Sequence, residues 1–363
     1  MSFSDPFAGA LGGGSFRAPR VQLIANGVPV PVPGVIDVEI VTNNHYSADR
    51  FRATISASGE FGGLQGLVDQ NDIAVEILLS LDGGGSCVSL FTGAVDTVDL
   101  EVVRGVVRIE GRDQSAALIE SRIEQTFANN TASEIAEILA ARHSLAPDVQ
   151  QTRTPSGRYW QLEHDQITLN QFSRATTEWD LLVVLAQFEG FDVWVSDQTL
   201  HFRPPVASPV PAAMLRPVDT LAGPANVSSI RLERALTLGG DIEVAVKSWN
   251  SRQAMSVVQT VGRSVAGRTG RRGQSYVYVV PNLTPDDAQK YAQERLLELT
   301  QHERVLVAEM PGELTILPRM MVGLEGSGTG FDQLYWVDRV ERRVSIAGGF
   351  RQIVRAKNVN LAP

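Results

Sequence analysis

Residues 276–357 read YVYVVPNLTPDDAQKYAQERLLELTQHERVLVAEMPGELTILPRMMVGLEGSGTGFDQLYWVDRVERRVSIAGGFRQIVRAK, and their pattern is the most informative about the fold class. Thr284 offers the side-chain acceptor of a helix N-cap, and Pro285 has the φ of a first helical residue. The two aspartates that follow place negative charge beside unpaired N–H groups. Apolar residues then recur at helical spacing as far as His302. We therefore predict a helix over residues 285–302.

Short alternating segments follow this helix, with glycines and prolines between them. The segment before the helix, residues 276–280, also has the pattern of a strand. The predicted strands after the helix are residues 305–310, 313–317, 320–324, 334–340 and 350–354. A helix followed by a meander of short antiparallel strands indicates a small barrel.

A second β-rich region begins near residue 21. Residues 21–24 and 28–32 flank Asn26-Gly27, the strongest short-range signal for a β-hairpin. Further segments alternate apolar and polar residues. They are residues 36–41, 50–56, 73–81, 87–96 and 102–110. This number of short strands within about a hundred residues favours a barrel or a sandwich.

Between these two regions, the apolar residues no longer only alternate but also recur at helical spacing. Thr131 and Glu134 form the pattern of a capping box and begin one predicted helix. Thr177 begins a second, which runs to the helix-ending Gly190. An aromatic-rich hairpin over residues 191–202 follows. This region is predicted to be α+β.

The order of these elements resembles a known family. The series 317–324 (LPRMMVGL), 335–340 (YWVDRV) and 349–354 (GFRQIV) is similar to the end of phage tail baseplate hub proteins of the late-control-D family, whose relatives form the base of type VI secretion spikes. Gly111 and Asp113 match the Gly-x-Asp after the last strand of that family's first barrel. The helix and hairpin over residues 181–202 resemble its middle domain.

The resemblance implies a mainly β, α+β fold: two small antiparallel β-barrels of the tail-tube type with an inserted α+β domain. The five segments expected are a flexible N-terminal arm (1–17), the first barrel (18–113), the middle domain (114–203), a Pro-rich linker (204–224) and the second barrel with its helix (225–363).

The same resemblance implies a structural protein without a cofactor, and not an enzyme. It would be the baseplate hub of a contractile phage tail or phage-like particle, a homotrimer that adapts the hexameric tail tube to the trimeric central spike. Expected partners are the tail tube or distal tail protein, the spike, the baseplate wedge proteins and the tape measure protein, with DNA passing through unbound. Assembly in the host cytoplasm and residence in the virion follow. The hub or spike base of an injection or secretion system is the alternative.

The composition fits a soluble protein and disfavours tight binding of DNA. Net charge is −9, and residues 1–150 carry 9 Arg, no Lys and 19 acidic residues. Such an acidic region disfavours tight duplex binding but suits a channel through which DNA slides. No apolar run is long enough to span a bilayer. Cys87 is the only cysteine, which excludes an internal disulfide.

Four arginines in a glycine-rich loop are the candidate contacts to a partner or to the channel: Arg263, Arg268, Arg271 and Arg272. A solvated loop is the alternative interpretation.

Catalytic motifs are not evident in the sequence. The one polar cluster, Glu163-His164-Asp165, leaves open a peptidoglycan-degrading tail enzyme. A carbohydrate-binding module also stays open. It would use exposed aromatic residues chosen from Tyr159, Trp160, Trp179, Trp194 and Trp336, each of which also fits a core position.

Overall fold

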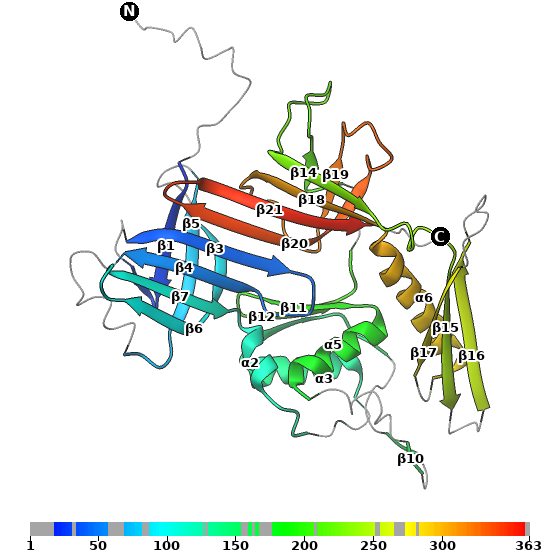
Figure 1. Ribbon diagram of the computed structural model, residues 1–363. Helices are drawn as coiled ribbons and strands as arrows, with labels where there is room; N and C mark the ends of the chain where they lie inside the picture. The colour runs from blue at the N-terminus through cyan, green and yellow to red at the C-terminus, as the bar shows by residue number, and fades with distance from the viewer. Residues whose placement is uncertain are drawn as a thin grey trace, which may run out of the picture.

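The computed structural model is dominated by one large sheet (Figure 1). The structure describes residues 18–30, 34–56, 69–81, 87–125, 127, 130–153, 159–161, 164–166, 176–206, 208, 210–250, 255–264, 273–280 and 283–359. In spatial order the strands of the sheet are β14 (Ser229–Arg234), β18 (Arg304–Pro311), β21 (Gly349–Asn358), β20 (Leu334–Ser345), β3 (Val35–Asn43), β4 (Arg50–Ser56), β7 (Val106–Arg112), β6 (Val88–Glu101), β5 (Ala74–Ser80), β1 (Arg20–Ala25) and β2 (Val28–Pro29). Strands β13 (Ala213–Leu215) and β19 (Met321–Leu324) branch from β20.

The N-terminal half of the sheet curls around its own core, so that β1 and β3 approach one another. The predicted hairpin is present, with Asn26 and Gly27 at φ 48° and 76° between β1 and β2. Leu23, Ile55 and Ile77 are fully buried among the aliphatic residues of this half. Alternate residues of each strand thus face inward, as the period of two in the sequence predicts.

The C-terminal half has a separate core between β14, β18, β19, β20 and β21. Leu306, Val340 and Val354 are fully buried in it. Three residues of the predicted Pro-rich linker, Ala213–Leu215, form β13 and pair in parallel with β19. Residues 313–317, predicted as a strand, lie outside the strands of the sheet. The bends and turns around Pro311, Gly312 and Pro318 interrupt pairing there.

Strands β3 and β20 join the two halves into one sheet. Asp37–Asn43 pair antiparallel with Arg339–Ser345, and Figure 1 shows blue β3 beside orange-red β20. The preceding part of β20 pairs on the same edge with β19. Strand β20 has 12 residues and is therefore long enough to pair first with β19 and then with β3 along the same edge. This junction between residues about 300 apart was not predicted.

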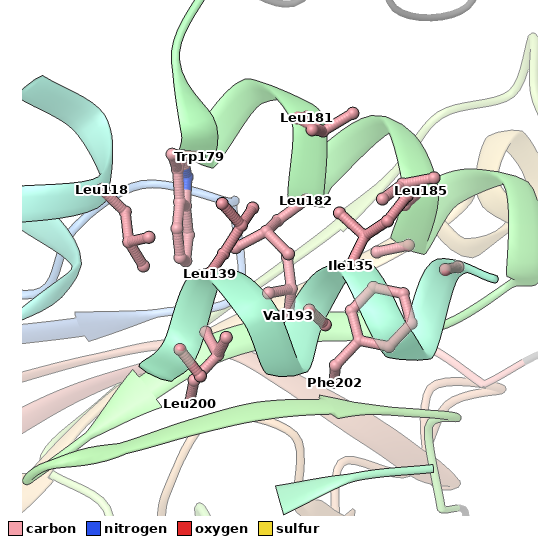
Figure 2. Close-up of a cluster of buried hydrophobic side chains, with 14 of the residues drawn as sticks. Leu118, Ile135, Leu139, Trp179, Leu181, Leu182, Leu185, Val193, Leu200 and Phe202 are labelled. Atoms are coloured by element: carbon pink, nitrogen blue, oxygen red, sulfur yellow. The ribbon is translucent and has the colours of Figure 1, made fainter. Parts of the chain in front are cut away.

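The middle region is a small α+β unit. It contains α2 (Ser115–Glu120), α3 (Ala132–Arg142), α5 (Glu178–Glu189), β8 (Ala146–Val149), β11 (Asp192–Ser196) and β12 (Thr199–Arg203). The predicted capping box at Thr131 is present, and the helix predicted to begin at Thr177 has one as well: Thr131 and Thr177 accept from Glu134 N and Asp180 N. Figure 2 shows Leu139, Leu182 and Phe202 meeting between the helices and the hairpin.

A second sheet stands apart from the large one. It has the order β16 (Met255–Arg263), β15 (Ile242–Asn250), β17 (Gln274–Val279), and α6 (Pro285–Gln301) packs on one face. The predicted helix is confirmed, with Thr284 as N-cap. The segment predicted as a strand of the second barrel is β17, whose ladder joins β15 and not the large sheet. Its tyrosines pack against α6.

The predicted fold class, α+β and mainly β, is confirmed. The domain boundaries stay a prediction, and the N-terminal arm 1–17 lies outside the described residues. Among the helices in the part of the chain that the structure describes, none has the length and apolarity to cross a bilayer.

Gly111→Ala should destabilise the N-terminal half. A Cβ at this position would lie 1.9 Å from the backbone oxygen of Ala94 and 2.7 Å from the ring of Phe51. Overpacking against backbone costs about 1–3 kcal/mol. Chemical denaturation should therefore show a free energy of unfolding lower by that amount. Gly330→Ala is the control, because its Cβ would meet only the end of the Arg304 side chain, at 4.0 Å, and should leave stability nearly unchanged. Equal effects of the two changes would contradict the packing argument.

Candidate functional site

The solvent-facing side of the large sheet carries a row of alternating charges that crosses the junction between the halves. Arg343 of β20, Glu39 of β3, Arg52 of β4 and Glu110 of β7 are successive neighbours in register. Arg52 Nε lies 2.7 Å from Glu110 Oε1. These neighbours raise the pKa of the Arg52 guanidinium, first through its hydrogen bond to Glu110. We call this surface the charged face.

Further ion pairs extend the charged face along both halves. They are Arg343–Asp37 at 2.8 Å, Arg339–Glu341 at 3.0 Å, Arg108–Asp99 at 3.4 Å, Arg112–Asp96 at 2.6 Å and Arg351–Glu309 at 3.9 Å. Such exposed pairs contribute about 0–1 kcal/mol each to folding. Their main effect is on the surface itself, where each of these arginines has an acid beside it. Arg50 and Arg355 face the same side and make no ion pair among the described residues. A polyanion passing this face therefore meets mostly paired arginines.

A cavity of about 550 Å³ lies where the two halves of the sheet meet the middle unit. Seven charged side chains line it. Asp197 and Arg203 are exposed, and the other five are partly or fully buried: Asp49, Asp113, Asp192, Arg319 and Arg342. None of these carboxylates lies within 4.0 Å of either guanidinium among the described residues. We call this cavity the junction pocket.

Burial changes the protonation of the acids in the junction pocket. It raises the pKa of Asp49 to about 7, and the nearby charge of Asp113 adds to this effect. Burial likewise raises the pKa of Asp113 to about 6, against the opposing hydrogen bonds from Ser115. Asp113 is the acid of the Gly-x-Asp pattern, so the sequence marked a residue that faces this pocket.

Arg319 and Arg342 of the junction pocket contact neutral groups, namely backbone carbonyl oxygens and an indole ring. Arg342 is 2 % exposed and donates to the carbonyl oxygen of Ile316 at 2.5 Å. Arg319 lies over the ring of Trp194 at 4.3 Å and donates to the carbonyl oxygen of Asn43 at 3.1 Å. Arg319 therefore connects the C-terminal half, the middle unit and the N-terminal half.

The predicted arginine contacts are only partly described. Arg263 donates to the Leu238 carbonyl oxygen at 2.7 Å and pairs with Glu303 at 3.1 Å, so its guanidinium makes contacts within the chain. Arg268, Arg271 and Arg272 lie outside the described residues. Contact of these arginines with a partner or a channel stays a prediction.

The other candidate residues are also only partly described. Glu163 lies outside the described residues, and His164 and Asp165 belong to β10 (His164–Gln166), which pairs with β9 (Tyr159–Gln161). Trp179 is buried and donates to the Tyr46 carbonyl oxygen at 2.7 Å, and Trp336 is 7 % exposed. No group of metal-ligating side chains comes together in the described part of the chain.

Known structures share this fold. A tail protein from Neisseria meningitidis MC58 has 16% identity over 94% of this chain and 97% of its own length, with a TM-score of 0.68. The 43 kDa tail protein of prophage MuSo2 from Shewanella oneidensis has 15% identity over 93% and 98%, with a TM-score of 0.67. A type VI secretion system component from E. coli has 13% identity over 93% and 77%, with a TM-score of 0.53. The fold is thus that of phage tail proteins and type VI spike components.

The sequence matches the phage tail baseplate hub (GPD) family over residues 51–347. The chain therefore belongs to the phage tail baseplate hub family, as its sequence pattern indicated. A search of curated proteins gave no match. The family is a structural one, and the chain is a tail component of phage or phage-like particles.

Asp49→Asn should flatten the dependence of stability on pH. The folded-state pKa of Asp49, about 7, lies above its ordinary value. Its contribution to stability is therefore complete below about pH 4 and is lost as pH rises through 7. At pH 8 the variant should gain up to about 4 kcal/mol over the natural chain, because a pKa difference of one between the folded and unfolded states is worth about 1.4 kcal/mol, and at pH 4 nothing. Thermal unfolding between pH 4 and 8 measures this, with exposed Asp69→Asn as the control. A gain as large at pH 4 as at pH 8 would contradict the assignment.

Arg319→Ala should destabilise the protein more than Arg319→Gly does. Both variants lose the contacts to Trp194 and Asn43. Arg319 also has φ 66°, a conformation that costs about 1–2 kcal/mol in a residue with a Cβ and little in glycine. Both should lower the free energy of unfolding, and glycine should recover about 1 kcal/mol of the loss. Equal losses in chemical denaturation would show that the backbone conformation stores no strain.

Proposed function

We propose that this chain is the hub at the centre of a tail baseplate and acts as a homotrimer between the hexameric tail tube and the trimeric central spike. The observation that carries this proposal is the single sheet made of two halves, each with its own core. Three copies would present six such halves in a ring and so match a six-membered tube above them. The β3–β20 ladder would hold the two halves of each copy at a fixed spacing.

The charged face supports a role as the channel wall. It is continuous across both halves, and most of its arginines are paired with acids. A wall of this kind would let DNA pass without binding it, because affinity for DNA comes mainly from cations that neutralise phosphates. The tape measure protein would occupy the same channel before ejection.

Other partners follow from the position of a hub. The tail tube or distal tail protein would lie on one side, the spike on the other and the wedge proteins around it. The particle would assemble in the host cytoplasm and carry the hub in the virion, with a contractile tail as the favoured form.

The hub or spike base of a contractile injection or secretion system is the second candidate. The similarity to the E. coli secretion component favours it, as does a TM-score of 0.54 to a chain of a Francisella PdpA-VgrG complex, of which the match covers 59%.

Light scattering coupled to size exclusion tests the proposed assembly. We expect a trimer at micromolar concentration, held by obligate interfaces of roughly 2,000 Å² or more. Addition of the neighbouring tube protein should give a co-migrating complex. A monomer that does not bind the tube protein would contradict the proposal.

Charge reversal on the charged face tests its place at the channel. Glu39→Lys with Glu110→Lys leaves Arg52 and Arg343 without their acidic neighbours in the row. The assembled hub should then bind DNA about tenfold more tightly at low salt, and particles should eject their genome more slowly. The control is Arg52→Glu with Glu110→Arg, which exchanges the members of one pair and keeps its net charge. An unchanged ejection rate despite tighter DNA binding would place this face outside the channel.

A further inference from the structure

Three polar side chains form a hydrogen-bonded line in the middle unit, on β8 and the hairpin β11–β12. Ser196 Oγ lies 2.7 Å from His201 Nε2, and His201 Nδ1 lies 2.7 Å from Asp148 Oδ2. The parallel pairing of β8 with β12 sets Asp148 beside His201. The antiparallel hairpin brings Ser196 to the other ring nitrogen.

The hydrogen bonds among Asp148, His201 and Ser196 indicate which of their atoms carry protons. The hydrogen bond to His201 holds the pKa of Asp148 below its ordinary range, so Asp148 is an ionised acceptor. His201 Nδ1 must then carry a proton. In the neutral ring Nε2 has the lone pair, and the Ser196 hydroxyl donates to it. This is the arrangement in which a histidine removes a proton from a serine.

The ring of His201 is held in place on its flat side as well. It stacks on the indole of Trp194 at 4.5 Å with an angle of 10° between the planes. Arg319 lies over the same indole, so the histidine is connected to the junction pocket. Arg203 donates to Asp148 at 2.9 Å and fixes the carboxylate.

We propose that Ser196, His201 and Asp148 form a nucleophilic site that hydrolyses neutral carboxylic esters. Ser196 is exposed and also lines the junction pocket, whose volume of about 550 Å³ is in the range of small-molecule sites. Pro204 and Val206 give the pocket an apolar wall. Acids and arginines nearly balance in the pocket, so a charged substrate would gain little there. The carboxyl groups would accept hydrogen bonds from hydroxyl groups, which favours the ester of a neutral, hydroxyl-bearing alcohol.

The turn after Ser196 offers donors for the oxyanion. Asp197 and Gln198 form a tight turn with Asp197 at φ 52°. Their amide groups donate no hydrogen bond in the part of the chain that the structure describes. The amide that follows a nucleophile is the one that often stabilises the developing negative charge.

The reaction would proceed in two steps. Ser196 Oγ forms a bond to the ester carbonyl carbon while its proton moves to His201 Nε2. The tetrahedral intermediate then expels the alcohol, which takes this proton, and leaves an acyl-serine. Water attacks the acyl group in the same manner with His201 as base, releasing the carboxylic acid and restoring the serine.

A fluorophosphonate probe tests the nucleophile in the full chain. Attack by Ser196 would form an O–P bond, expel fluoride and pass the proton to His201. We expect stoichiometric labelling at Ser196 by peptide mass spectrometry, and none in Ser196→Ala. Hydrolysis of 4-nitrophenyl acetate should fall by roughly 100-fold in His201→Gln, with the thermal unfolding temperature unchanged in Ser196→Ala.

Ser256→Ala is the matched control, because Ser256 is an exposed strand serine away from the site. It should keep full labelling and hydrolysis. Absence of labelling in the natural chain would overturn the proposal, as would equal labelling of Ser196→Ala. Either result would leave the hub role intact, since trimer formation and tube binding are measured separately.

Discussion

The pairing of β3 with β20 joins the two halves of the large sheet, and both the charged face and the junction pocket form along it. On one edge β20 joins β19 and then β3, and a bulge between Val337 and Arg339 marks the change on its other ladder, with β21. The carboxylate of Asp338 lies at this bulge, 3.2 Å from Lys357 and 3.1 Å from His45. A side chain exposed by only 2 % needs such partners, because an unpaired buried charge is costly. The contact of Asp338 with His45 and the backbone bonds of the ladder thus hold the two halves together.

This junction also explains why two arginines stand next to each other in the sequence. Successive residues of a strand face opposite sides of the sheet. Arg343 therefore joins the charged face, where it pairs with Asp37, and Arg342 points into the junction pocket. One short segment of β20 builds the solvent-facing surface and the buried interior at once. The surface proposed for the channel and the pocket proposed for chemistry therefore share a strand.

Local signals predicted most elements, and long-range pairing accounts for most of what was missed. The caps at Thr131, Thr177 and Thr284 each depend on residues within one turn, so the sequence shows them directly. The β3–β20 ladder, the extra strand β16 and the separate sheet under α6 depend on partners far apart in the chain. The line through Ser196, His201 and Asp148 was missed for the same reason. Its acid is 53 residues from its histidine, and no motif signals that spacing.

Strained backbone, an unsatisfied donor and acids with raised pKa values all occur at the junction pocket. Arg319 has a positive φ, and the Nε of Arg342 has no hydrogen-bond partner among the described residues. Three acids, Asp49, Asp113 and Asp192, have a raised pKa because they are buried. On the charged face, by contrast, opposite charges alternate from strand to strand. A fold usually tolerates strain and unpaired charge where another requirement holds them in place. Because Ser196 opens onto this pocket, a small-molecule site is a requirement that would account for keeping polar groups there.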